Sequence, residues 1–316
     1  MLLFTEQDVR SLLPMAEAVP LMRRVFEDLG NGKAQNHARR RLILPTGSVL
    51  HSLAGAFGGY FGTKVYSSNP RHGAYFHLLL FSAEDARPLA LMAANYLGQI
   101  RTGAASGFAT ALLAKPDAAT LAVIGSGFQA RSQLEAMLVA RPFRSVRVWS
   151  RSAEKRDRFV AECSAAFGIP IEPAGTAEQA VRGAEVIVTA TTSREPVLEA
   201  DWVSPRALVN AVGSNQAKRR ELPAALIERA GLIAVDSIEQ ARVESGDLIL
   251  ALDEAGWKSP KLTELAELAV GRRTYDGDAP IIFKSNGLGV EDIAAAGFVY
   301  ERADKSALQE LPDLYS

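Results

Sequence analysis

The stretch from Gly125 to Ala130 is the part of this sequence whose residue types and spacing point most directly to chemistry. It reads G-S-G-F-Q-A, which fits G-x-G-x-x-A, and it lies between the apolar run LAVIG and an amphipathic helix pattern. The first glycine permits a tight turn, the second admits a pyrophosphate to the backbone, and the small third residue allows close packing. A helix N-terminus adds positive partial charge. We therefore expect a dinucleotide to be bound by Gly125, Ser126, Gly127, Phe128, Gln129 and Ala130. A tight turn without a ligand is the weaker interpretation.

The residues after the next apolar strand, SVRVW, bear on which dinucleotide is used. A carboxylate there would bind the adenosine ribose, but the sequence offers Ser150, Arg151 and Ser152. A guanidinium pairs well with phosphate oxygens. Ser150 and Arg151 thus favour a 2′-phosphate, and NADPH over NADH, although a solvated loop arginine would look the same. Thr191 and Thr192 follow a later apolar strand and are expected near the nicotinamide half, with helix capping as the alternative role.

These residues must be positioned by repeated strand–helix units that begin at Thr120. The strands LAVIG, SVRVWS, AEVIVTAT, ALVNAVGS and GLIAVDS are separated by helical patterns, including residues 152–167. Such alternation predicts an α/β fold with a doubly wound parallel sheet of the Rossmann type. The boundary before it is expected near Lys115-Pro116-Asp117, since proline disfavours a continuing helix.

The chain before Thr120 has a different pattern. Residues 5–30 have helical spacing after a plausible N-cap, Thr5, and Gly30 and Gly32 end it. From Arg40 to Phe81 short apolar runs alternate with turn residues, which predicts an antiparallel sheet. Residues 93–113 are rich in alanine and glycine and predict a close-packed helix or helix pair, and the chain from about Val290 is again helical.

Composition excludes several classes of protein. The 316 residues exceed the usual single core and favour two domains. A net charge of −1 gives no reason to expect nucleic acid or an anionic membrane as partner. No apolar run approaches the ~20 residues of a membrane span, and MLLFTEQDVR is unlike a signal peptide. With Cys163 as its single cysteine and no H-E-x-x-H pair, the chain is expected to be cytoplasmic, without disulfide or metal.

Several segments together resemble the ornithine cyclodeaminase/μ-crystallin family, over almost the whole chain and in the right order. They are G-T-K-V at 62–65, R-T-G-A-A-S at 101–106, V-I-G-S-G-F-Q-A at 123–130, N-A-V-G-S-N…E-L at 210–222 and F-K-S-N-G at 283–287. The resemblance implies a homodimer that uses NAD(H) or NADP(H) on small α-amino or α-imino acids. It also implies an α+β substrate-binding and dimerisation domain, residues 1–117 with 290–316, beside a Rossmann domain, residues 118–289.

The resemblance also assigns site residues. Arg101 matches the arginine that binds the substrate carboxylate, a task suited to a bidentate guanidinium. Arg41 matches a second substrate arginine, with Arg40 open because the register is uncertain and a solvated strand end as the alternative. Lys64, in the apolar run YFGTKVY, is expected at the carboxylate and imine rather than snorkelling to the surface. Ser285 and Asn286 are expected on the cofactor side, while Asp236 and Glu291 are interpreted as structural.

Asn215 departs from the pattern of cyclodeaminases, which carry an aspartate there for ammonia loss. Asparagine cannot ionise, so it cannot be that general base, although it can orient a substrate or a nicotinamide amide. The variant G-S-N resembles bacterial reductases of Δ1-pyrroline-2-carboxylate within the family. The leading hypothesis is therefore reduction of this ketimine, or of Δ1-piperideine-2-carboxylate, to L-proline or L-pipecolate. The alternatives are an alanine-type dehydrogenase, ornithine cyclodeamination, and a crystallin-like protein that binds NADPH without catalysis.

Overall fold

The computed structural model describes residues 1–312, which form two compact units. The first unit comprises Met1–Arg101 and the chain from Gly287 onward, and the second comprises Thr102–Asn286. Helix α3 (Asn95–Leu113) begins in the first unit and ends in the second. The domain limits predicted from the sequence, near residues 117 and 290, stay a prediction, and residues 313–316 of that C-terminal segment lie outside the described chain.

The first unit is built on a mixed sheet with the strand order β15-β1-β6-β5-β4-β3-β2. Strands β2 to β6 are antiparallel neighbours, which confirms the sheet predicted from Arg40 to Phe81. Strand β1 joins parallel to β6 and antiparallel to β15. The strands are β1 (Leu2–Phe4), β2 (Gln35–Ile43), β3 (Val49–Phe57), β4 (Tyr60–Asn69), β5 (Gly73–Ser82), β6 (Pro88–Ala93) and β15 (Gln309–Glu310).

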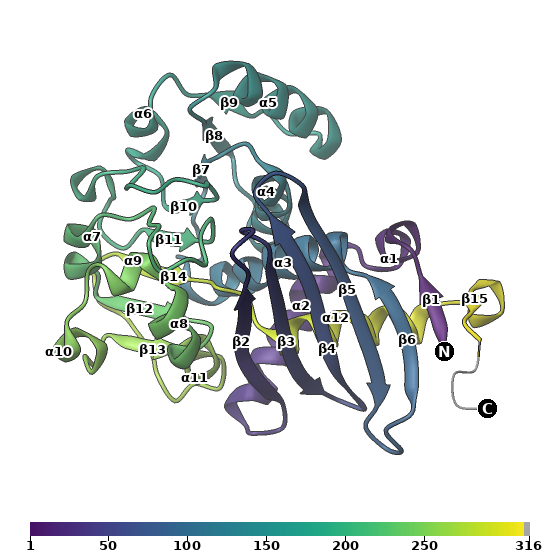
Figure 1. The fold of residues 1–316 in the computed structure, drawn as a ribbon. Helices are drawn as coiled ribbons and strands as arrows, with labels where there is room; N and C mark the ends of the chain where they lie inside the picture. The colour runs from purple at the N-terminus through teal and green to yellow at the C-terminus, as the bar shows by residue number, and fades with distance from the viewer. Residues whose placement is uncertain (313–316) are drawn as a thin grey trace. The chain divides into compact units, whose positions relative to one another are not determined.

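Helices α2 and α12 lie on one face of this sheet (Figure 1), with α12 across β2 to β5. Alternation along β4 turns Gly62 and Lys64 towards α12, so Phe61 and Val65 point to the opposite face. Gly55 of β3 lies against the first turn of α12, where a Cβ would stand 2.6 Å from the Cα of Val290. The helices here are α1 (Glu6–Leu12), α2 (Met15–Gly30), α12 (Gly289–Arg302) and the 3-10 turn η2 (Lys305–Ala307).

The single helix predicted over residues 5–30 is wrong in one respect, because the structure has two. Helix α1 ends at Leu12 and α2 begins at Met15, with Pro14 as its N-cap. A residue before proline is disfavoured in the helical region, which explains the break at Leu13. Thr5 is confirmed as the N-cap of α1, where its hydroxyl accepts from the backbone N–H of Asp8 in a capping box.

The second unit contains a wholly parallel sheet with the order β13-β12-β14-β11-β10-β7-β8-β9. The chain starts at β7, adds β8 and β9 on one side, and then crosses to β10 on the other, which is the strand reversal of the Rossmann fold. The doubly wound fold is thus confirmed. Its strands are β7 (Thr120–Ile124), β8 (Ser145–Trp149), β9 (Glu172–Pro173), β10 (Val186–Thr189), β11 (Leu208–Ala211), β12 (Leu232–Val235), β13 (Leu262–Glu264) and β14 (Ile281–Lys284).

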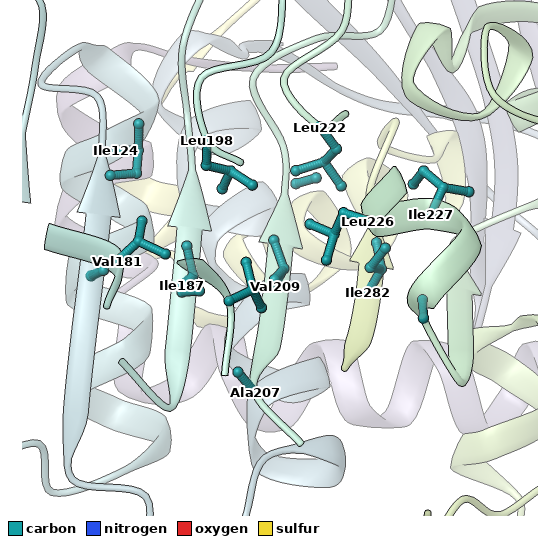
Figure 2. Packing of buried hydrophobic residues seen from close by; sticks show 14 of the residues in the cluster. Ile124, Val181, Ile187, Leu198, Ala207, Val209, Leu222, Leu226, Ile227 and Ile282 are labelled. Atoms are coloured by element: carbon teal, nitrogen blue, oxygen red, sulfur yellow. The ribbon is translucent and has the colours of Figure 1, made fainter. Parts of the chain in front are cut away.

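The central strands of this sheet are buried along their whole length, as expected for a parallel sheet covered on both faces. On one face, Ile187, Val209 and Ile282 pack with Val181 and Leu226 from two helices (Figure 2). The helices and the 3-10 turn η1 are α4 (Phe128–Ala140), α5 (Ala153–Phe167), α6 (Ala177–Val181), η1 (Ala200–Trp202), α7 (Ala224–Arg229), α8 (Ile238–Glu244), α9 (Gly246–Ile249), α10 (Glu254–Trp257) and α11 (Leu265–Ala269). Among the described residues, no helix is long and apolar enough to cross a membrane.

Candidate active site

The loop between β7 and α4 has the geometry expected of a phosphate-binding turn. Gly125 has φ +123°, and a Cβ there would collide with the carbonyl oxygen of Ala190. Gly127 is the N-cap of α4 without a side-chain cap, and a Cβ there would meet nothing within 4 Å. Ala130 is fully buried. These residues fit a pyrophosphate, because open space and a positive helix N-terminus meet where no side chain intervenes.

The end of β8 lies beside this loop. The hydroxyl of Ser126 donates to that of Ser150 over 2.9 Å. Arg151 follows as an exposed residue, and Ser152 caps α5 by accepting from the backbone N–H of Lys155. The segment therefore places the Ser150 hydroxyl against the glycine-rich loop, and the exposed Arg151 is the next residue.

Thr191 follows β10 and is bound by a buried carboxylate, that of Glu221. Oε1 of Glu221 accepts from the backbone N–H of Thr191 at 2.7 Å and from its hydroxyl at 2.8 Å. Oε2 accepts from the hydroxyl of Thr189 at 3.0 Å and from the N–H of Gly213 at 2.7 Å. Burial and the neighbouring Asp247 raise the pKa of Glu221. Thr192, the next residue, is exposed.

The loop Gly213–Asn215 after β11 is held from the other side by Lys284, the last residue of β14. The Lys284 ammonium donates to the carbonyls of Ser214 at 2.6 Å and Ala211 at 3.3 Å, and it pairs with Asp247 at 3.2 Å. Lys284 and Asp247 are both fully buried. Asn215 itself is half-buried.

Ser285 and Asn286 continue from β14 and are fixed by Asp236, which directly follows β12. Oδ2 of Asp236 accepts from the backbone N–H of Asn286 at 2.5 Å and from the Ser285 hydroxyl at 3.4 Å. The two residues expected to bind cofactor are thus anchored at the carboxyl edge of the parallel sheet. Asp236 has the structural role that the sequence suggested.

A second group of ionisable side chains lies in the first unit, where the structure brings Lys64 and Arg101 together through Asp292. The Lys64 ammonium lies 2.5 Å from Oδ2 of Asp292, and Arg101 Nε lies 2.9 Å from Oδ1. Nη1 of Arg101 lies 2.6 Å from Oε2 of Glu291. All four side chains are at most 7% exposed. They come from β4, α3 and the first turn of α12.

Burial and neighbouring charges shift the pKa values of the two cations, Lys64 and Arg101. Burial lowers the pKa of Lys64 from 10.5 to about 7, with Asp292 opposing the shift and Arg101 and Arg39 adding to it. For Arg101, burial acts in the same direction, but Asp292 and Glu291 outweigh it and raise its pKa. Arg101 therefore stays charged, whereas the ammonium of Lys64 titrates near neutral pH.

The arginine run of β2 is divided by a register shift between His37 and Arg40. Arg39 is 7% exposed and donates to the carbonyl of Gly287 at 3.2 Å, whereas Arg40 is exposed and Arg41 is half-buried. Arg41 pairs across the strands with His51. The sequence could not locate this irregularity, which decides which arginine is buried near Lys64 and makes Arg39 a candidate that the sequence prediction missed.

His51 is a further side chain that the sequence did not single out. Its ring stacks on Tyr66 at 4.1 Å between centroids, and Nε2 lies 3.0 Å from the Ser68 hydroxyl. The residue is 9% exposed, and within residues 1–312 its buried Nδ1 has no hydrogen-bond partner. Burial, then Arg41 and Arg39, lower its pKa to about 4, so the imidazole is neutral.

Asp292, Glu221 and Asp247 were also missed, although one signal was present. Glu291 and Asp292 are adjacent acids in the first turn of a helix that is otherwise buried, where a solvated helix would expose them. Within the described residues, no group of histidine, cysteine or carboxylate side chains is arranged to hold a metal ion.

Comparison with known sequences places these features in a family. A model of the ornithine cyclodeaminase/mu-crystallin family matches residues 1–307. A Δ1-pyrroline-2-carboxylate reductase of Bacillus cereus is 38% identical over 229 residues, which cover 72% of this chain and 70% of the relative.

Two solved structures share the fold. One is the Δ1-pyrroline-2-carboxylate reductase of Thermococcus litoralis in complex with NADH and L-proline, with a TM-score of 0.92 and 30% identity over 98% of this chain and 100% of that one. The other is an archaeal alanine dehydrogenase dimer with bound NAD, with a TM-score of 0.92 and 30% identity over 99% of both chains.

Proposed function

Because this chain belongs to the ornithine cyclodeaminase/mu-crystallin family, we propose that it reduces a cyclic ketimine acid. It is an NAD(P)H-dependent oxidoreductase that acts on carbon–nitrogen bonds. The proposed substrates are Δ1-pyrroline-2-carboxylate and Δ1-piperideine-2-carboxylate, and the products L-proline and L-pipecolate. The observation that supports this most is the buried pair of Lys64 and Arg101, joined by Asp292.

This pair suits a substrate carboxylate. Asp292 occupies one donor of the Lys64 ammonium and Nε of Arg101, and Glu291 occupies Nη1. An ammonium carries three donor hydrogens and a guanidinium five, so both cations have donor capacity beyond these contacts that suits a planar anion. Asp292 thus orients both cations, and Arg41 or the buried Arg39 adds a third positive charge on β2.

The reaction needs a protonated imine, because a neutral C=N accepts hydride poorly. When bound, the nicotinamide supplies the hydride that attacks C2. Lys64, with its pKa lowered to about 7, is suited to hold a proton near the imine nitrogen and to pass it on at neutral pH. Holding the carboxylate in a fixed orientation supplies proximity, and the buried cations supply charge complementarity.

The cofactor side of the proposal rests on the second unit. Gly125 to Ala130 hold the pyrophosphate, and Ser150 with Arg151 receives a 2′-phosphate, so we propose NADPH as the preferred form. Thr191, Thr192, Ser285 and Asn286 line the nicotinamide half. Asn215 lies in the loop after β11 and orients substrate or nicotinamide through hydrogen bonds, without the ionisation that ammonia loss requires.

An open-chain amino acid is the second candidate substrate. It is favoured by the likeness to the alanine dehydrogenase that binds NAD. The two candidates differ in one requirement, since reductive amination of pyruvate consumes ammonia whereas a preformed ketimine does not.

The test is to mix the protein with Δ1-pyrroline-2-carboxylate and follow the absorbance of NADPH and of NADH. We expect rapid oxidation of the cofactor with L-proline formed, faster with NADPH, and no ammonia from ornithine with NAD. Turnover only with pyruvate and ammonia would favour the dehydrogenase. Ammonia released from ornithine would show that Asn215 does not prevent deamination.

We also propose that the protein is a cytoplasmic homodimer. The sheet of the first unit carries both packed helices on one face. On the opposite face Phe61 stacks on Phe81 at 5.4 Å and remains 38% exposed. An apolar sheet face without a covering helix is the usual mark of an interface.

A further inference from the structure

We propose that Lys284 is a positioning residue for the nicotinamide half of the cofactor, acting through Asp247, Glu221 and the backbone of Ser214. The proposal concerns the second unit alone. It requires a nicotinamide cofactor but does not depend on which imino acid is reduced.

Lys284 stands where the carboxyl ends of the central strands lie side by side. The strand register pairs Lys284 with Ala211, Ala211 with Thr189, and Thr189 with Ile124, which precedes the phosphate loop. Ligands of open parallel sheets bind outside this edge, and the strands after the reversal carry the second half of a dinucleotide. The loops after β10 and β11 are therefore those closest to the reacting ring.

A continuous chain of charged contacts ties these loops to Lys284. The ammonium binds the carbonyl of Ser214 directly. Its partner Asp247 accepts from the backbone N–H groups of Glu221 at 2.6 Å and Leu222 at 2.9 Å. The carboxylate of Glu221 then binds Thr191 and the N–H of Gly213. One lysine thus fixes both sides of the loop after β11 and, through two carboxylates, the loop after β10.

The two loops also approach each other closely through their backbones. A Cβ at Gly213 would collide with the backbone of Thr191, and a Cβ at Gly125 would collide with the carbonyl of Ala190. A shift in one loop is therefore passed to the next, because close-packed backbone has no free volume to absorb it.

A contribution to folding stability does not by itself explain why these three ionisable side chains are buried together. Burying three ionisable side chains carries a desolvation cost that the ion pair seldom exceeds, and apolar replacements are often as stable. What the network provides is a single conformation for loops whose own residues are polar and irregular. A site that transfers hydride needs its reacting atoms held within a fraction of an ångström.

The test compares Lys284→Met with a control, Lys261→Met. Lys261 also binds two backbone carbonyls, those of Ile227 and Glu228 at 2.9 and 3.0 Å, but it precedes β13 and so lies at the amino-terminal edge of the same sheet. For each variant we would measure the melting temperature and, by calorimetry, the Kd of NADPH and of its fragment 2′,5′-ADP. The primary deuterium isotope effect on turnover would be measured as well.

We expect Lys284→Met to weaken NADPH binding by roughly tenfold or more, the cost of losing a charged hydrogen bond, with little change for 2′,5′-ADP. Its isotope effect should rise because hydride transfer becomes slower. Lys261→Met should leave both affinities and the isotope effect near those of the wild type, whatever its melting temperature.

The proposal is overturned if Lys284→Met lowers only the melting temperature, or if it weakens the fragment as much as NADPH. Where Lys284→Met does not fold, Asp247→Asn decides by the same criteria. It keeps an oxygen for the backbone N–H groups of Glu221 and Leu222 but turns the Lys284 contact into one between two donors.

Discussion

At the scale of single residues, the lowered pKa of the Lys64 ammonium is the property that can be measured most directly. Its pKa is lowered to about 7 because burial outweighs the attraction of Asp292. Below this pH the group is charged and binds a carboxylate, and above it the neutral amine does not. We therefore expect kcat/KM for the imino acid to fall as the pH rises through about 7, because kcat/KM reports the free enzyme.

The control for this prediction is Lys64→Arg, since a guanidinium stays charged throughout the range. If the fall in kcat/KM disappears in this variant, it is due to the titration of Lys64. If the fall persists, it is due to the titration of the substrate imine. The Kd of NADPH should be nearly unchanged. A wild-type profile that is flat between pH 6 and 9 would contradict the prediction.

Arg151 provides the residue-scale test of cofactor choice. Arg151→Ala should weaken NADPH by about tenfold or more, through the loss of a charged phosphate contact, and leave NADH nearly unchanged. Arg144, which is also exposed but precedes β8 and so lies at the other end of that strand, is the comparison variant when changed to alanine. Equal losses of affinity for NADPH and NADH would show that Arg151 does not bind the 2′-phosphate.

At the scale of elements, the start of α12 carries the two carboxylates that hold Lys64 and Arg101. The close contact of this helix with β3 determines the distance between α12 and the sheet. Gly55→Ala would place a Cβ against the backbone of Val290, one residue before Glu291. We expect a loss of about 1–3 kcal/mol in the free energy of unfolding, typical of overpacking, together with a lower kcat/KM. Urea unfolding and steady-state kinetics would measure both.

Gly59→Ala is the matched control, because a Cβ at this turn would meet nothing within 4 Å and no positive φ is required. It should behave as the wild type does. If Gly55→Ala kept full stability and activity, the close approach of β3 to α12 would not be what places Glu291 and Asp292.

The elements also show what a sequence can and cannot predict. The glycine-rich turn and the alternation of buried strands with helices followed from local patterns, because a glycine turn and a buried strand are each encoded by a few adjacent residues. The break at Pro14 has a local cause too, but the long apolar periodicity concealed it. Arg39 and Asp292 depended on a bulge and on a contact with residues about 190–230 positions away, and neither leaves a local pattern.

At the scale of the whole molecule, the open face of the first sheet predicts an oligomeric state. Phe61→Glu should convert the proposed dimer to a monomer, since a charge buried at an apolar interface is costly and the side chain is 38% exposed in the single chain. Sedimentation velocity would measure the change. Leu112→Glu, at an equal exposure of 38% on α3, should leave the mass unchanged. A dimeric mass for both Phe61→Glu and the wild type would place the interface elsewhere, and a monomeric wild type would overturn the proposed dimer.

The short connection from the end of β14 to the start of α12 has a consequence for how this protein can evolve. Residues 284–292 run from the lysine that holds the cofactor-side loops to the acids that hold the substrate-side cations. A chimaera that exchanges residues 102–286 with those of a relative must cross over inside this short segment. The positioning of the cofactor and the binding of the substrate therefore both depend on this segment, and recombination near residue 287 should alter both at once.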